Sequence, residues 1–177
     1  MKIGIVGYKR HAGKHIEIIS RIYPNFELTI FHPSKKSEKI TNVFNNLLKC
    51  QCIIISSPTN THIEYIRKLG ENNFQGHLYV EKPAFSTIEE SIELEKLQKK
   101  FSLNITIGYH FPFENKIKRL KDILFAPDTG EIISIDILMS KGIAYSKWFT
   151  DDWRKKDKLS VSHTGLSHVL SIYYFLC

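Results

Sequence analysis

Short apolar runs alternate with longer segments of helical periodicity along the first two thirds of the chain. The apolar runs, each bounded by turn residues, predict strands over residues 3–6, 28–31, 52–55, 78–80 and 105–107. The segments between them carry apolar residues at helical spacing and predict helices over residues 13–22, 37–48, 61–70 and 87–101. Continuous apolar strands joined by helices are typical of a parallel sheet covered on both faces. The sequence therefore predicts an α/β fold with a Rossmann-like, doubly wound parallel sheet.

Two of these helices begin with the pattern of a capping box, in which Thr is followed three residues later by Glu. The pattern occurs at residues 61–64 and again at residues 87–90. In such a box the Thr side chain accepts a hydrogen bond from a backbone N–H of the first helical turn. We expect both helices to start at these positions.

The pattern changes after Gly108. The remaining sequence predicts helices over residues 113–125 and 161–177 and one alternating strand over residues 131–139. A lone strand does not form a stable sheet, so this strand needs pairing within the fold, with another chain, or with sequence absent here. Together with the apolar segment 172–176, the unpaired strand predicts a homo-oligomer or a self-associating chain.

The change of pattern also predicts the domain organisation. We expect a dinucleotide-binding Rossmann domain over residues 1–110, followed by the start of a partial α+β domain over residues 111–177.

Composition and charge add little to this picture. Hydrophobic residues make up 42% of the chain and charged residues 24%, as in ordinary folded domains. No apolar run approaches a transmembrane length, and the first residues lead directly into a strand pattern without a secretory signal, so a cytoplasmic protein with no membrane partner is expected. The net charge of +7 fits either an anionic metabolite or nucleic acid, but the basic residues are dispersed, and nucleic-acid binding is not favoured. Cys50 and Cys52 lack a second pair that would complete a zinc site, so no metal site is expected.

The first strand and helix enclose the stretch GIVGYKRHAGKH, residues 4–15. Gly7 and Ala12 fit the first and third small positions of the dinucleotide fingerprint G-x-G-x-x-G/A, whereas Lys9 stands where the second glycine would let the backbone approach a pyrophosphate. The residues expected to contact a cofactor at this turn are Gly7, Tyr8, Lys9, Arg10, His11 and Ala12. The alternative is a bare strand–helix turn that binds nothing.

The second predicted strand is followed by the loop His32-Pro33-Ser34-Lys35-Lys36. Sites for NAD usually carry Asp or Glu here for the adenosine ribose hydroxyls, and this loop has no carboxylate. A hydroxyl and cations at Ser34 and Lys35 suit a 2′-phosphate, so NADP is favoured over NAD. The alternative is a solvated basic loop.

Four segments in order resemble the Gfo/Idh/MocA family of nicotinamide-dependent sugar and polyol oxidoreductases. They are GYKRHAGKH (7–15), SSPTNTHIEYI (56–66), EKPAFSTIEE (81–90) and GYHFPF (108–113), and the resemblance continues into GEI (130–132), Trp153-Arg154 and His168. It implies a Rossmann domain followed by a larger α+β domain. Because the chain ends early in that second domain, we expect a shortened member of the family.

The resemblance also implies roles for individual residues and a cis bond between Lys82 and Pro83. Lys82 would orient the reacting substrate hydroxyl, and His168, one helical turn after Thr164, would exchange its proton. The residues expected near the cofactor are Ser57, Pro58, Thr59, His62, Glu81, Lys82, Tyr109, Trp153 and Arg154. His62 also fits a helix N-terminal histidine without a ligand.

The sequence leaves two functions open. The first is an NADP- or NAD-dependent oxidoreductase acting on a sugar or nucleotide-sugar hydroxyl or keto group. The second is a truncated, catalytically inactive relative that binds only a nucleotide or a partner chain. Lys9, the replacement of a family arginine by Pro112, and the missing sheet favour the second function.

Overall fold

A computed structural model describes residues 1–139 and 165–177 of the chain. These residues form two compact units, Met1–Gly108 and Tyr109–Cys177, and each is described by itself. The predicted residues Thr164, Trp153 and Arg154 lie outside the described residues.

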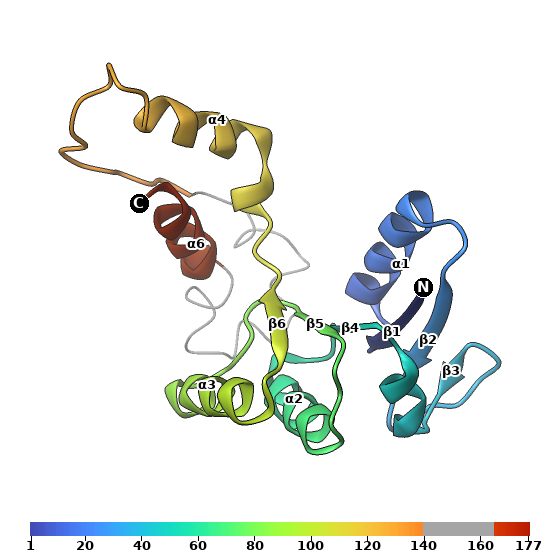
Figure 1. Cartoon of the computed structure of the whole chain (residues 1–177). Coiled ribbons are helices and arrows are strands. Elements are labelled where there is room, and N and C mark those ends of the chain that lie inside the picture. Colours follow the sequence, from blue (N-terminus) through green and yellow to red (C-terminus); the bar gives the residue numbers. More distant parts are fainter. Residues whose placement is uncertain (140–164) are drawn as a thin grey trace, which may run out of the picture. The chain divides into compact units, whose positions relative to one another are not determined.

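The first unit is built on a six-stranded sheet in the order β3-β2-β1-β4-β5-β6 (Figure 1). The strands are β1 (Lys2–Val6), β2 (Glu27–Phe31), β3 (Ile40–Thr41), β4 (Cys52–Ile55), β5 (His77–Val80) and β6 (Asn104–Ile107). All neighbouring pairs are parallel, and in the centre Ile5 lies opposite Ile30 on one side and Ile54 on the other. This is the strand order of the dinucleotide-binding Rossmann fold, which confirms the predicted fold class.

Helices cover the two faces of the sheet unequally. The helices of this unit are α1 (Arg10–Ile22), α2 (His62–Glu71) and α3 (Ile88–Phe101), with 3-10 helices η1 (Phe44–Lys49) and η2 (Thr59–Thr61). Apolar residues of η1, α2 and α3 form a large buried cluster on one face, whereas α1 forms a small cluster with the centre of the sheet on the other face. Accordingly β1 and β4 are apolar along most of their length, whereas β5 alternates between partly exposed and buried residues and β6 between exposed and partly exposed ones.

The predicted helix over residues 37–48 is wrong, because this segment forms β3 and η1 instead. Ile40 pairs with Ile30 at the sheet edge, and the Thr41 hydroxyl accepts hydrogen bonds from the backbone N–H of Val43 (3.1 Å) and the Asn46 amide (3.2 Å). Such local bonds compete with helix formation. The apolar residues that gave the helical spacing pack against the large buried cluster from η1, where Leu47 is fully buried and Phe44 and Leu48 are partly buried.

Only one of the two predicted capping boxes forms. At α3 the Thr87 hydroxyl accepts from the Glu90 N–H (3.2 Å), and the Glu90 carboxylate accepts from the Ser86 N–H (2.5 Å). At α2 the Thr61 side chain makes no cap, and its hydroxyl donates to the Pro58 carbonyl at 2.7 Å within η2. The expected cis bond between Lys82 and Pro83 is confirmed.

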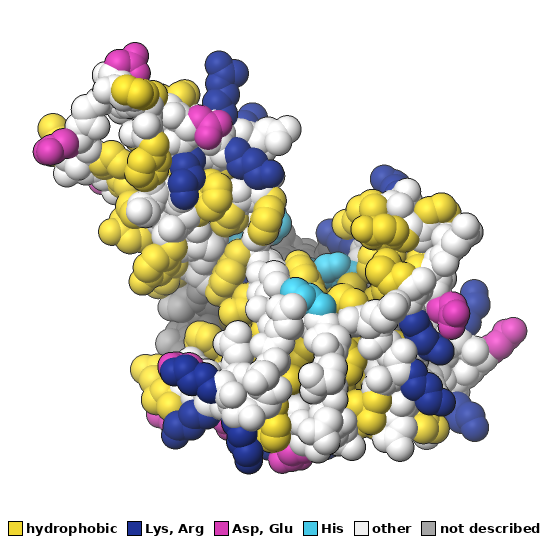
Figure 2. All heavy atoms as spheres, viewed as in Figure 1, with side chains coloured by type: hydrophobic (Ala, Val, Ile, Leu, Met, Phe, Trp, Pro, Cys, Tyr) yellow, Lys and Arg dark blue, Asp and Glu magenta, His cyan; other side chains and the backbone are white. Residues whose placement is uncertain are grey.

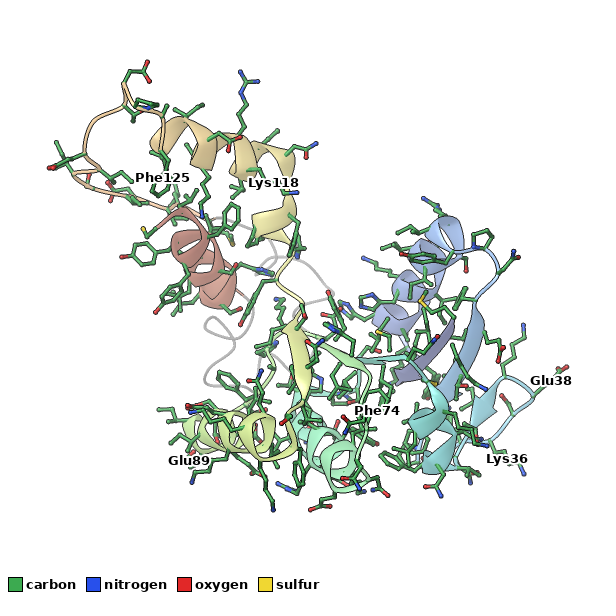
Figure 3. The ribbon with its side chains drawn as sticks, viewed as in Figure 1. Lys36, Glu38, Phe74, Glu89, Lys118 and Phe125 are labelled. Carbon is green, nitrogen blue, oxygen red and sulfur yellow. The ribbon has the colours of Figure 1, made fainter. Side chains whose placement is uncertain are left out.

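Side chains near the edge strand and in the loops of this unit differ sharply in exposure (Figure 3). Lys36 and Glu38, between β2 and β3, are exposed. Phe74, in the turn after α2, is buried and packs against the large cluster.

The second unit contains η3 (Phe111–Phe113), α4 (Asn115–Leu124) and α6 (Ser167–Leu176). The Lys121 ammonium on α4 donates to the Phe175 carbonyl on α6 at 2.5 Å. The strand predicted over residues 131–139 is wrong, since this segment has no strand structure and Ile133 and Leu138 are 98% and 97% exposed. An alternating pattern becomes a strand only when a neighbouring strand pairs with it, and no described residue does so here. Along residues 1–139 and 165–177, no helix is long and apolar enough to cross a membrane.

Candidate functional site

The carboxyl ends of the central strands meet at one edge of the sheet. Backbone hydrogen bonds continue one residue past each strand, from Gly7 to Phe31, from Ser56 to Val6, from Glu81 to Ile55 and from Gly108 to Val80, all between 2.9 and 3.0 Å. The turns that begin with Gly7, Ser56 and Glu81 are therefore neighbours in space although they are far apart in sequence. In open parallel sheets ligands bind at this edge.

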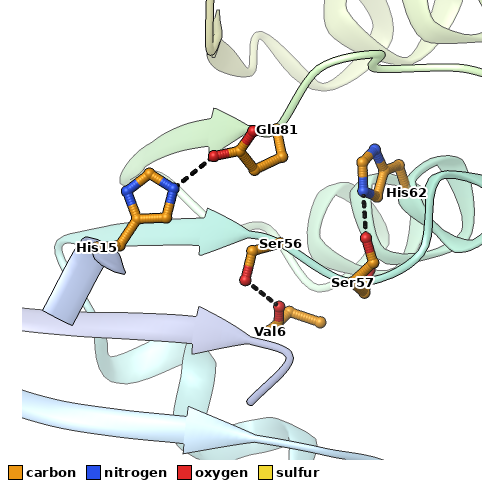
Figure 4. A network of polar contacts seen from close by, with 6 residues as sticks. All are labelled: Val6, His15, Ser56, Ser57, His62 and Glu81. Atoms are coloured by element: carbon orange, nitrogen blue, oxygen red, sulfur yellow. Dashed lines mark hydrogen bonds and ion pairs between the residues drawn. The ribbon is translucent and has the colours of Figure 1, made fainter. Parts of the chain in front are cut away.

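Gly7 fits its turn for two reasons. Its φ of +107° lies in a region that L side chains rarely adopt. A Cβ at this position would also lie 3.1 Å from the Ser56 carbonyl oxygen. The Ser56 hydroxyl donates back to the Val6 carbonyl at 3.1 Å, so the turn after β1 is fastened to the loop after β4 (Figure 4).

Helix α1 starts directly behind this turn. Lys9 is the N-cap residue, in ordinary extended conformation with φ −84° and ψ −164°, so the side chain that replaces the expected glycine does not strain the backbone. The first backbone bond of the helix runs from the Gly13 N–H to the Lys9 carbonyl, which leaves the earlier N–H groups without a helical acceptor. Such groups attract anions. Ala12 is fully buried against the sheet.

The loop after β2 packs against the turn after β1. The ring centroid of His32 lies 4.8 Å from that of Tyr8, and the Lys35 ammonium lies 4.3 Å from the Tyr8 ring centroid. Lys35 lowers the pKa of Tyr8 from its ordinary value of 10.0 by a hydrogen bond to the phenol and by its charge. The Ser34 N–H donates to His32 Nδ1 at 3.3 Å. Ser34 and Lys35, both predicted to contact a cofactor, are exposed beside Tyr8.

A hollow of about 480 Å³ lies beside the end of β2. Its lining combines apolar rings with a few polar groups and consists of Phe31, Pro33, Phe44, Thr61, Glu64, Tyr65, Lys68 and Asn72. Hollows of this composition suit a flat organic group.

His62 lies beneath the loop that follows β4 rather than on its surface. The side chain is only 1% exposed, and its Nε2 donates to the Ser57 carbonyl at 2.9 Å (Figure 4). This hydrogen bond holds the backbone at Ser57 in place. Burial lowers the pKa of His62 from its usual 6.5, and the backbone carbonyl of Ser57 opposes that shift only in part.

The burial of His62 predicts a pH dependence of stability. The unfolded chain takes up a proton on His62 below about pH 6.5, whereas the buried ring in the folded chain does so only at lower pH. Stability is therefore fully present above this pH and declines as the pH falls through it. His62→Gln keeps an N–H donor for Ser57 and removes the titration, so it should lose less unfolding free energy between about pH 7.5 and about pH 5.5 in urea denaturation. Equal losses in variant and wild type would contradict this prediction.

Glu81 and Lys82 follow β5, with Glu81 turned toward α1. The His15 Nε2 lies 2.6 Å from the Glu81 Oε1, and the two side chains are 19% and 18% exposed (Figure 4). Burial raises the pKa of the Glu81 carboxyl, but the hydrogen bond and charge of His15 outweigh it, so the pKa lies below its ordinary value of 4.5. Lys82 directly follows Glu81 in the chain and is partly exposed.

In the second unit the predicted residue His168 lies beside His110. His168 on α6 is 1% exposed, and its ring centroid lies 5.0 Å from that of His110 and 4.9 Å from that of Phe111. Tyr109 directly precedes this cluster, and burial raises the pKa of its phenol.

Sequence reasoning missed His15, which belongs to the quoted stretch after β1 but was assigned no role. A detectable signal was its spacing from His11, because residues four apart on a helix share a face. The charge of His11 also lowers the pKa of the Glu81 carboxyl.

Comparison with known proteins agrees with this geometry. The sequence model of the Gfo/Idh/MocA family, described as an oxidoreductase family with an NAD-binding Rossmann fold, matches residues 1–109. Among curated proteins, glucose-6-phosphate 3-dehydrogenase of Bacillus subtilis (strain 168) is 24% identical over 99% of this chain, and the chain spans 53% of that enzyme. Among solved structures, a dehydrogenase (MviM) from Clostridium difficile is 30% identical with a TM-score of 0.57, covering 69% of this chain and 43% of that one. An NAD-binding protein from Listeria innocua is 18% identical with a TM-score of 0.70, covering 99% of this chain and 54% of that one.

Proposed function

Because the family match covers residues 1–109 of 177, the chain belongs to the Gfo/Idh/MocA family of oxidoreductases, and we propose that it binds NADP or NAD and transfers a hydride between this cofactor and a sugar or nucleotide-sugar hydroxyl or keto group. One observation carries the proposal. The turns that begin with Gly7, Ser56 and Glu81 meet at the carboxyl edge of one parallel sheet, where Rossmann domains hold dinucleotides.

The residues present fit a dinucleotide. Gly7 forms the tight turn, and the N–H groups of the first turn of α1 suit the phosphates. The side chain of Lys9 adds a cation where the fingerprint has glycine, and it can contact a phosphate that lies slightly farther out. The hollow beside β2 offers apolar surface to the adenine end.

When bound, the nicotinamide ring supplies or accepts the hydride. The protein side of the reaction falls to Lys82 and His168. The Lys82 ammonium, at the edge that receives the cofactor, stabilises negative charge that develops on the substrate oxygen. His168 exchanges the proton of the same hydroxyl, a task that suits an imidazole near neutral pH.

The sugar class of substrate rests on the relatives. The curated relative with the longest match is named for glucose 6-phosphate as its substrate, and it aligns with 99% of this chain. The net charge of +7 suits an anionic sugar derivative. We therefore expect turnover within a panel of sugar phosphates, nucleotide sugars and polyols rather than with simple alcohols.

The preference for NADP follows from the loop after β2. No carboxylate occurs in this loop before Glu38, and Lys35 and Ser34 are exposed beside the Tyr8 ring. A carboxylate that binds ribose hydroxyls would repel a 2′-phosphate, whereas an ammonium and a hydroxyl attract it.

Reversing the charge at Lys35 should reverse this preference. We expect Lys35→Glu to weaken NADPH binding by at least about tenfold, because an attractive contact becomes a repulsive one, and to change NADH binding by less than about threefold. Titration of both cofactors by nicotinamide fluorescence measures the ratio. Lys99→Glu, a substitution on the exposed face of α3, is the matched control and should leave both affinities unchanged. Tighter binding of NADH than of NADPH by the wild type would refute the preference.

The same titration tests the proposed function as a whole. Binding of either reduced cofactor, followed by cofactor-dependent turnover of a compound in the panel, supports the oxidoreductase. Binding without turnover of any compound would instead favour the nucleotide-binding relative without catalysis. Failure to bind either cofactor at millimolar concentration would refute the proposal.

A further inference from the structure

The Glu81 carboxylate links two segments that are far apart in the sequence, the Glu-Lys-Pro segment and the helix that follows the Gly7 turn. Its Oε1 is 2.6 Å from Nε2 of His15, which lies in the second turn of α1. The backbone N–H of Glu81 donates to the Ile55 carbonyl, so the residue is anchored at the carboxyl edge of the sheet (Figure 4). The contact therefore joins the helix behind the Gly7 turn to the Glu-Lys-Pro segment.

The position of His15 is fixed by packing as well as by this hydrogen bond. Its ring meets the ring of Tyr79 edge to face, with centroids 5.3 Å apart. A Cβ at Gly108 would lie 2.5 Å from the Tyr79 hydroxyl, which is closer than van der Waals contact allows, so glycine suits this position. Gly108, the first residue after β6, thus packs against the same ring that meets His15.

The charge of Glu81 lies close to a site for anions. Glu81 follows β5, and its backbone N–H bonds to β4, the strand that lies next to β1 and its turn, which is proposed to receive the dinucleotide phosphates. Two negative groups at the same sheet edge repel each other, so the direction in which the carboxylate points affects the binding of an anion. A carboxylate that is largely buried has a further need for a partner, because an unpaired buried charge is costly.

We propose that His15 is a positioning residue for dinucleotide binding, which fixes the Glu81 carboxylate on the side of α1 by a hydrogen bond. The inference rests on the proposed function in that the ligand is the dinucleotide. It assigns Glu81 to the protein framework rather than to direct contact with the cofactor. Loss of the His15 donor should therefore harm binding through Glu81, and removal of the Glu81 charge should relieve that harm.

The test is a set of variants titrated with NADPH by fluorescence. His15→Leu removes the donor and should weaken binding about tenfold, whereas His15→Gln keeps an N–H at the position of Nε2 and should stay within about threefold of the wild type. Glu81→Gln alone should weaken binding less than His15→Leu does. The double variant His15→Leu with Glu81→Gln should recover most of the lost affinity. Glu17→Gln breaks the exposed ion pair with Arg21 on the same helix and is the matched control, with unchanged binding.

The outcomes separate this inference from the proposed function. If the wild type binds neither NADPH nor NADH, the proposed function and this inference both fail. If the wild type binds but Glu81→Gln alone weakens binding as much as His15→Leu, Glu81 contacts the cofactor and only the inference is overturned. A double variant that binds no better than His15→Leu also overturns it, since a purely structural role gives no such recovery. Thermal denaturation of each variant identifies any that fail to fold, and in that case the comparison of Glu81→Gln with the wild type still decides.

Discussion

Lys82→Met is expected to lower turnover by about 10²- to 10³-fold while changing cofactor affinity by less than about threefold. Methionine keeps an unbranched side chain of similar length but removes the ammonium, so charge that develops on the substrate oxygen loses its stabilising partner. Steady-state kinetics with whichever compound of the sugar panel the wild type oxidises or reduces measures the loss. It should appear in kcat more than in KM, because the interaction strengthens in the transition state.

The control for this variant is Lys99→Met on α3. Lys99 is 76% exposed and forms an ion pair with Glu95 one helical turn away, so its loss should leave turnover unchanged. An unchanged kcat in Lys82→Met would contradict the role of Lys82, and equal losses in both variants would point to a general effect of lost positive charge.

Leu78→Ala is expected to reduce the free energy of unfolding by about 3 kcal/mol. Leu78 is fully buried on β5, in register between Ile53 and Ile105, and it faces the large cluster formed with η1, α2 and α3. Truncation removes buried methyl groups and leaves a cavity that the close-packed strands cannot fill. Urea denaturation followed by circular dichroism measures the change.

Leu138→Ala is the matched control, since this leucine is 97% exposed and its truncation should change the unfolding free energy by less than about 0.5 kcal/mol. A loss below about 1 kcal/mol in Leu78→Ala would show that the first unit is less tightly packed around β5 than the structure indicates.

The sequence predicted most accurately those elements that depend on local pattern or are buried on both faces. The runs that became β1 and β4 are apolar along most of their length because both faces of the sheet are covered there, and this produces a signal that needs no knowledge of distant residues. The capping box at Thr87 was also readable, since all its partners lie within five residues.

Predictions failed where distant contacts decide the structure. Residues 37–48 carry helical spacing, yet pairing of Ile40 with Ile30 and local bonds to the Thr41 hydroxyl win over the helix. The alternating segment 131–139 has no strand partner among the described residues and stays irregular. In both cases the pattern records which residues are apolar but not what lies opposite them.

The candidate site shows the same division. Gly7 was identified from its place in the dinucleotide fingerprint, which lies entirely within the first strand, turn and helix. The burial of His62 and the contact of His15 with Glu81 join residues that are close only after the sheet has formed, and the latter pair is 66 positions apart. A pattern read from a single sequence does not reveal a contact between residues so far apart in the chain.

The two-residue strand β3 has a consequence for the behaviour of the chain in concentrated solution. It forms one outer edge of the sheet, where Ile40 and Thr41 are its only members. An edge this short offers a second molecule too few backbone groups for intermolecular sheet growth, and the exposed Lys36 and Lys39 beside it repel an identical copy. The same segment can therefore vary in sequence and length, and with it the loop proposed to face the ribose end of a cofactor, without creating a template for aggregation.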